Sequence, residues 1–234
     1  SQQGSGTIDS SDPSLGNLKD NGGSTQTHAL QPGSPAIDAG EDSSIPTDDA
    51  DLNDDSNTSE TLPVDQRGEN RQVGTVDIGA FENQKPVLAD ENPTLTNINE
   101  DTSNPSGNTI ADIVVDNSIT DVDTDTVPEA IAVTNVDSSN GTWQYDSGSG
   151  WNNFPSVAAD KAVLLDENAK IRFIPNSNYN GTATFTFRAW DKSSGSNGDS
   201  NVNTNDSNVS AFSTETDTAE ITVNDAPTIS NIDN

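Results

Sequence analysis

The stretch that decides the fold is Ile171–Asp191, IRFIPNSNYNGTATFTFRAWD, because it holds the cleanest alternation of apolar and polar residues in the chain. Within it, Thr182–Trp190 reads TATFTFRAW, and Phe185, Phe187 and Ala189 occupy every second position. The intervening positions hold mostly threonine and arginine. A period of two is typical of a strand with one face on a core and one face on solvent. The stretch therefore predicts an antiparallel sheet.

Two Asn-Gly pairs stand directly before predicted strands. Asn180-Gly181 precedes the stretch just quoted, and Asn140-Gly141 precedes a second run that also begins with threonine. Asn-Gly between apolar runs is the strongest short signal for a β-hairpin. Both pairs therefore predict hairpin turns.

Six further strands are expected outward from this stretch. Seven short strands in about 140 residues, with no helix of useful length, predict an all-β chain with an antiparallel β-sandwich. Ten of the eleven aromatic residues lie between Trp143 and Phe212, which places the expected core there. The six strands are predicted at Ile110–Val115, Ala130–Val136, Thr142–Tyr145, Ala162–Leu165, Lys170–Ile174 and Thr218–Val223.

The chain divides into three zones. Residues 1–83 are rich in Gly, Ser and Asp, residues 84–224 hold the predicted strands, and residues 225–234 begin a new segment. Residues 93–100, PTLTNINE, and residues 227–234, PTISNIDN, are similar and start 134 residues apart, a plausible domain length. The last zone is predicted to be the first strand of a following repeat, or a strand exchanged with a neighbouring subunit.

The composition indicates that a cation is needed to balance the negative charge of the chain. The chain carries 39 Asp and Glu against 9 Lys and Arg, for a formal net charge of -30. Phosphate would be repelled, so nucleic acid is excluded as a partner. No stretch is long and apolar enough to predict a transmembrane segment, and the absence of cysteine excludes disulfides and thiolate metal sites. Because Ca²⁺ takes six to eight oxygen ligands, calcium is the predicted cofactor.

Residues 41–61 have no periodicity and are interpreted as an acidic loop, either flexible or ordered by calcium.

The sharpest metal signal is Asp121-x-Asp123-x-Asp125, followed by Glu129. Carboxylates at alternate positions of a tight loop can converge on one hard cation. The pattern is not an EF-hand, because Thr126 stands where that loop needs glycine. The alternative is a solvated acidic turn.

An aromatic hairpin supplies a second candidate. Asp146-x-Gly148-x-x-Trp151 resembles the Asp-box, in which the aspartate orders a turn and the tryptophan plugs the core. Trp143, Tyr145 and Trp151 could instead stack on a sugar, although strand aromatics are usually buried. Core packing is the favoured interpretation. The single histidine, His28, lacks any recognisable catalytic partner pattern and is predicted to be structural.

The first zone holds a set of motifs, which are DPSLGNLKDNGGSTQTHALQPGSPAIDAG (Asp12–Gly40), DQRG (Asp65–Gly68), Arg71 and DIGAFE (Asp77–Glu82). With these motifs the zone resembles the C-terminal end of secreted right-handed parallel β-helix proteins. The resemblance implies the last rungs and the cap of such a helix. Arg67 and Arg71, which stand among acids, are predicted to form structural ion pairs.

A second set of motifs lies within residues 86–226. It includes NEDTSNPSGNTIADIV (Asn99–Val114), ITDVDTD (Ile119–Asp125), SNGTWQYDSGSGWNNF (Ser139–Phe154), IRFIPNSNYNGTATFTFRAWD (Ile171–Asp191) and TAEITVNDAP (Thr218–Pro227). This stretch resembles the cadherin-like repeats of large bacterial adhesins, including the RTX type. The resemblance implies a calcium-rigidified sandwich, with junction acids that share calcium between successive modules. Those acids would be Glu100, Asp101, Asp191 and Asp225, and ordinary linker polarity is the alternative. The glycine-rich nonapeptide repeats of RTX proteins do not occur.

These observations predict a structural or adhesive module of an extracellular, bacterial cell-surface protein rather than an enzyme. Its expected partners are neighbouring repeats of the same protein or identical subunits. One alternative is a subunit of an extracellular filament or sheath, assembled by strand exchange. Another is a calcium-dependent module that binds a surface glycan or peptide.

Overall fold

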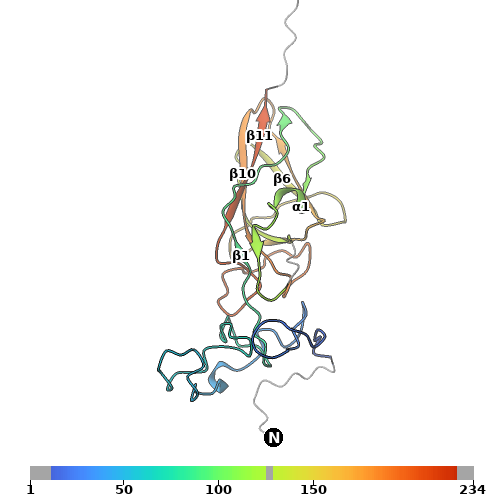
Figure 1. Cartoon of the computed structure of the whole chain (residues 1–234). Coiled ribbons are helices and arrows are strands. Elements are labelled where there is room, and N and C mark those ends of the chain that lie inside the picture. Colours follow the sequence, from blue (N-terminus) through green and yellow to red (C-terminus); the bar gives the residue numbers. More distant parts are fainter. Residues whose placement is uncertain (1–11, 125–128, 226–234) are drawn as a thin grey trace, which may run out of the picture.

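The computed structural model describes residues 12–124 and 129–225. Almost all regular structure among these residues is β, which confirms the all-β part of the predicted fold class. Strands are confined to the region after residue 86, and residues 12–83 hold only a 3₁₀ turn, η1 (Asp42–Ser44), and isolated antiparallel bridges. In Figure 1 this N-terminal segment, residues 12–83, lies at one end of an elongated β domain.

Two sheets face one another in the β domain. The larger has the order β2-β11-β10-β5-β8 and the smaller has the order β3-β9-β6-β7. Pairing is antiparallel except between β2 and β11. A separate pair, β1-β4, lies nearer the N-terminal segment. The strands are β1 (Val87–Leu88), β2 (Ile98–Asn99), β3 (Asn108–Thr109), β4 (Ile119–Thr120), β5 (Ile131–Val136), β6 (Gly141–Asp146), β7 (Asn152–Asn153), β8 (Val163–Leu165), β9 (Lys170–Pro175), β10 (Gly181–Ala189) and β11 (Asp217–Asn224).

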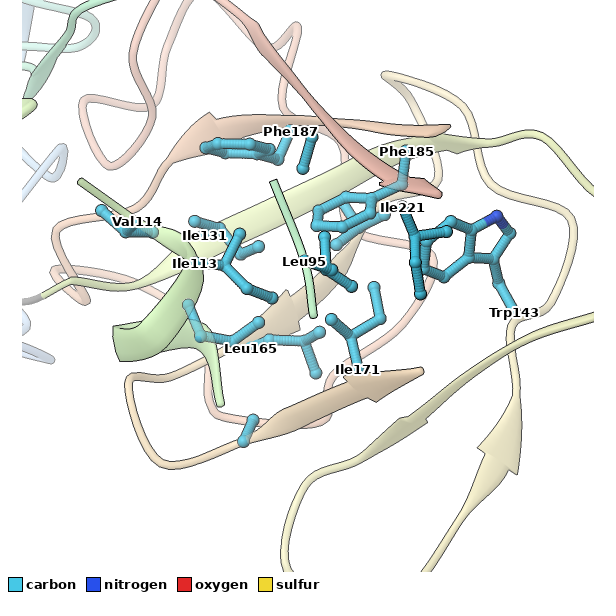
Figure 2. Close-up of a cluster of buried hydrophobic side chains, with 14 of the residues drawn as sticks. Leu95, Ile113, Val114, Ile131, Trp143, Leu165, Ile171, Phe185, Phe187 and Ile221 are labelled. Carbon is cyan, nitrogen blue, oxygen red and sulfur yellow. The ribbon is translucent and has the colours of Figure 1, made fainter. Parts of the chain in front are cut away.

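The main core fills the space between the sheets (Figure 2). Trp143 of β6 contacts Phe173 of β9 with ring centroids 5.1 Å apart, and Phe185 of β10 at 5.3 Å. Phe185 and Phe187 face inward together, as their alternation predicts. The predicted strand at Thr182–Trp190 is thus confirmed as β10.

A second core covers the outer face of the larger sheet. Ala130 and Ala132 point away from the main core and pack with Leu164, Trp190 and Phe212. Trp190 and Phe212 belong to the long connection between β10 and β11, residues 190–216, which lies over this face. Because both faces of β5 are buried, it reads as an almost continuous apolar run.

The predicted strand at Ile110–Val115 is wrong, since the chain forms a helical turn there, α1 (Ile110–Ile113). Thr109 accepts a hydrogen bond from the Asp112 amide, and the Asp112 carboxylate accepts one from the Thr109 amide, which makes a reciprocal capping box. Ile110 and Ile113 are buried together. Ile110 and Ile113 are three residues apart, so they lie on one face of a helix. The β-branched residues of this stretch favoured a strand in the sequence-based prediction.

Both predicted Asn-Gly hairpins are also wrong. β5 and β6 belong to different sheets, and so do β9 and β10, so each Asn-Gly pair lies on a crossover between sheets. Neither Asn140 nor Asn180 has the positive φ that a type I′ turn requires. An ideal Cβ on Gly141 would lie 2.3 Å from the Phe173 ring, so Gly141 is needed for close packing rather than for a turn.

Candidate metal centre

The strongest sequence candidates meet where the N-terminal segment docks on the sandwich, a region called the joint below. Asp121 and Asp123 lie just after β4, and Asp191 lies two residues after β10. All three line a pocket of about 590 Å³ together with Asn83 of the N-terminal segment and Lys192. Two carboxylates of the Asp-x-Asp pattern and a third carboxylate 68 residues further along the chain thus share one space. Asp125 lies outside the described residues.

Hydrogen bonds fix the three carboxylates. Asp121 Oδ1 accepts a hydrogen bond from the Asp123 amide at 2.9 Å, as expected for a tight loop. Asp191 accepts one from the Ser193 amide at 2.7 Å and one from the Asn83 side-chain amide at 3.2 Å. Asp123 Oδ2 accepts one from the Gln84 amide at 2.5 Å. The Asn83 partner is the last residue of the N-terminal segment, and the Gln84 partner is the residue that follows it.

Burial and mutual repulsion disfavour three negative charges at the joint. Burial raises the pKa of Asp121 to about 6, with a further contribution from the charge of Asp191. Burial and the neighbouring Asp121 raise the pKa of Asp123 to about 7. Burial, aided by Asp123, raises the pKa of Asp191 to about 6. A bound divalent cation would reverse this penalty, because it favours the charged form of each group.

One arginine already neutralises part of this charge. Arg67 Nη1 lies 2.7 Å from Asp123 Oδ1, and Arg67 Nε lies 2.8 Å from Asp65 Oδ2. Its guanidinium also donates to the Glu82 carbonyl at 2.6 Å and stacks 3.6 Å from the Phe81 ring centroid. The predicted ion pairing of Arg67 is confirmed, and one of its partners is Asp123, a predicted metal ligand. Among the described residues, no three His, Cys, Asp or Glu side chains are arranged as a ready-made metal site.

A second layer of buried acids lies behind the joint, and sequence reasoning missed it. Glu82 is fully buried, burial raises its pKa to about 8, and its carboxylate accepts the Val73 and Asp77 amides. Arg71 Nη1 lies 3.8 Å from Glu82 Oε2, so the predicted ion pairing of Arg71 is confirmed. Burial also raises the pKa of Asp77 to about 6. The only sequence signal was that these acids sit inside apolar DIGAFE, where a solvated carboxylate would not be expected.

The remaining junction acids lie at the start of β10 and the end of β11, whereas Asp191 follows the other end of β10. Figure 1 shows these two strands running along the length of the domain. The Glu100 amide donates to the Asn224 carbonyl at 2.7 Å, which brings Glu100 beside the end of β11. Asp101 accepts the Asn178 amide at 3.1 Å, and Asp225 accepts the Asn180 side-chain amide. Glu100, Asp101 and Asp225 therefore share one end of the domain, and Asp191 lies at the other.

Glu129 lies beside another carboxylate, that of Asp116. Burial and the neighbouring Asp116 raise the pKa of Glu129, and Glu167 adds to the effect. Glu167 itself pairs with Lys192, which lines the same pocket as Asp121 and Asp191.

The aromatic candidates divide by burial. Trp143 is 1% exposed in the main core, so it cannot stack on a ligand, and core packing is confirmed for it. Tyr145 packs on Phe154 at 4.8 Å. Trp151 lies half-buried with the Arg172 guanidinium 4.0 Å from its ring centroid, so it does not plug the core as an Asp-box tryptophan would.

The turn and the histidine behave as structural elements. Asp146 Oδ1 accepts the Gly148 and Gly150 amides, both at 2.8 Å, which orders the turn between β6 and β7. His28 Nδ1 lies 2.7 Å from the Gly16 carbonyl oxygen, a local contact within the N-terminal segment. Within the described residues, no helix has the length and apolarity to cross a membrane.

Comparison with known proteins adds no assignment. No family model, no curated protein sequence and no solved structure matches this chain.

Proposed function

We propose that this chain is a calcium-stabilised structural or adhesive module of a large bacterial extracellular surface protein. In this proposal the sandwich is a cadherin-like extender, and the N-terminal segment is the end of a parallel β-helix docked on it. The observation that carries the proposal is the separation of the junction acids into two clusters at opposite ends of an elongated sandwich. Cation sites at both ends are what a rigid spacer between neighbouring modules requires.

Of the two ends of the sandwich, the joint has the more deeply buried carboxylates. Asp121, Asp123 and Asp191 are carboxylates whose charged forms are penalised by burial and by one another. Oxygen donors of this kind suit Ca²⁺, which accepts irregular geometry. A cation there would bridge the sandwich and, through Asn83 and the Arg67 contact to Asp123, the N-terminal segment. Calcium would thus stiffen the connection between the two.

The test is chemical unfolding with calcium and with chelator, followed by tryptophan fluorescence, because all three tryptophans lie in the sandwich. Calcium at 100 times its Kd should add about 2.7 kcal/mol to stability. Asp121→Asn combined with Asp191→Asn should remove most of that increment. Asp160→Asn, at an exposed position, is the matched control and should retain it. If calcium stabilises the double variant as much as it stabilises the unmodified chain, the joint is not the calcium site.

One observation favours a second candidate, a filament subunit assembled by strand exchange. Residues 93–100 form the edge of the larger sheet by pairing alongside β11, through the Leu95 and Glu100 amides and the Pro93 carbonyl. Residues 227–234 have a similar sequence and could occupy the same edge in another copy. Deleting residues 227–234 and measuring mass by light scattering separates the candidates, since only exchange predicts loss of assembly.

A further inference from the structure

A second acidic feature lies in the N-terminal segment, far along the chain from the joint acids. Residues 48–60 read DDADLNDDSNTSE, and we call them the 48–60 loop. Oxygen-bearing side chains recur at every second position from Asp51 through Asn53 and Asp55 to Asn57, and Glu60 follows. No Lys or Arg occurs between residues 41 and 66. Any charge compensation for the loop must therefore come from elsewhere.

The loop closes on its own carboxylates. The Ser56 amide donates to both oxygens of Asp51, at 3.1 and 3.2 Å. The side-chain amides of Asn53 and Asn57 donate to the two oxygens of Glu60, at 3.1 and 3.0 Å. Side chains from both arms of the loop thus gather around the Glu60 carboxylate.

An independent observation points to a cation ligand at the base of the loop. Asp48, at the base of the loop, is only 1% exposed, and its Oδ1 has no hydrogen-bond partner in the structure. Its Oδ2 accepts the Leu52 amide at 2.8 Å, and its backbone amide donates to the Glu60 carbonyl at 2.9 Å. The first contact places the Asp48 carboxylate against the first arm of the loop, and the second holds the Asp48 backbone beside Glu60 at the end of the other arm. A buried carboxylate oxygen without a donor is costly unless a cation satisfies it.

The spacing of the loop matches what a hard cation needs. In calcium loops, oxygen ligands at positions 1, 3 and 5 surround the ion, and position 6 makes a sharp turn. With Asp51 at position 1, Asn53 and Asp55 fall at positions 3 and 5. Ser56 falls at position 6 and has the left-handed φ of 69° that this turn requires. The loop is still not an EF-hand, because its glutamate, Glu60, stands at position 10 rather than 12.

We propose that the 48–60 loop is a separate calcium site, with Asp51, Asn53, Asp55 and Glu60 as side-chain ligands and Asp48 as the buried oxygen at its base. Rotation of the Asn53 amide by a half turn replaces its nitrogen with its oxygen beside Glu60. Two oxygens that bind one Ca²⁺ lie roughly 3 Å apart, and the side chains of Asn53 and Glu60 are already 3.1 Å apart. The carboxylates are not preassembled among the described residues, so the ion draws them together as it binds.

This site is independent of the joint and is tested separately. Calcium titration of the full chain by calorimetry should show one fewer site in Asp51→Asn and in Glu60→Gln than in the unmodified chain. Asp160→Asn should leave the count unchanged. The double variant at Asp121 and Asp191 should retain the loop site, so failure of one proposal does not imply failure of the other.

A residue-level measurement covers the case of a variant that does not fold. In the unmodified chain, the amide resonances of Ser56 and Asn57 should shift saturably as calcium is added, and magnesium at the same concentration should shift them less. Two results would overturn the proposal. One is a calcium titration of the folded Asp51 and Glu60 variants that is identical to that of the unmodified chain. The other is that the Ser56 and Asn57 resonances do not shift when calcium is added.

Discussion

Replacing Arg67 with methionine is the most direct test of how the N-terminal segment is held on the sandwich. The Arg67 side chain is 1% exposed and is paired with Asp65 and Asp123, whose side chains are 0% and 10% exposed. Methionine keeps the apolar stem but leaves both carboxylates without their cation. Removing one partner of a buried ion pair costs about 3–5 kcal/mol.

The cost should appear as opening of the joint. Asp123 Oδ2 accepts the Gln84 amide, so this amide is protected only while the joint is closed. Asp65 Oδ2 accepts the Glu82 amide within the N-terminal segment, so this second amide reports whether Asp65 keeps its position without Arg67. At about 1.4 kcal/mol per tenfold, native-state hydrogen exchange at these two amides should accelerate roughly 10²- to 10⁴-fold. Amides in the β10–β11 ladder, such as that of Ala183, should change much less.

Acid should relieve the defect. The pKa of Asp123 is already raised to about 7 with Arg67 present, and losing the arginine raises it further. Below that pKa the carboxyl is neutral and no longer needs the cation, so the variant should differ less from the unmodified chain at pH 5 than at pH 8. Lys161→Met, which removes an exposed positive charge, should have no effect at either pH. Exchange at Glu82 and Gln84 within threefold of the unmodified chain at pH 8 would refute this account of the joint.

Three further outcomes are expected. Trp143→Ala should cost about 3–5 kcal/mol in urea unfolding because it empties the centre of the core, whereas Trp151→Ala should cost about 1 kcal/mol, and equal losses would contradict the assigned burial. Thr109→Ala should cost about 0.5–2 kcal/mol through loss of the helix cap, with Thr109→Ser restoring most of it. Glu82 stays protonated in the folded chain up to a pKa of about 8, while in the unfolded chain it ionises near pH 4.5, so stability should fall as pH rises across that window. Glu82→Gln should reduce this dependence of the urea midpoint on pH. Asp77 and the three joint carboxylates, whose pKa values are also raised, account for the slope that remains.

The local alternation of apolar and polar residues was enough to predict a strand and its buried side where the strand has one face on the core. The alternation of Phe185 and Phe187 determined which side of β10 is buried, because the side-chain period of a strand is fixed by backbone geometry. It failed at Ile110–Ile113, where β-branched residues form a capped helical turn. It failed again at Asn140-Gly141, because whether a turn pairs two strands or carries the chain between sheets depends on residues far away in sequence.

The candidate sites divide in the same way. The all-β class, the acidic character and the Asp121-x-Asp123 pattern could all be predicted without a structure, since each depends on neighbours along the chain. Only the tertiary structure brought Asp191 to Asp121 and Asp123, and sent Glu100, Asp101 and Asp225 to the opposite end. Only the folded chain shows that Arg67 pairs with Asp123, which lies 56 residues away. A buried charge is costly without a partner of opposite charge. Which charges are buried depends on how the chain packs, so this pairing could not be predicted from the sequence.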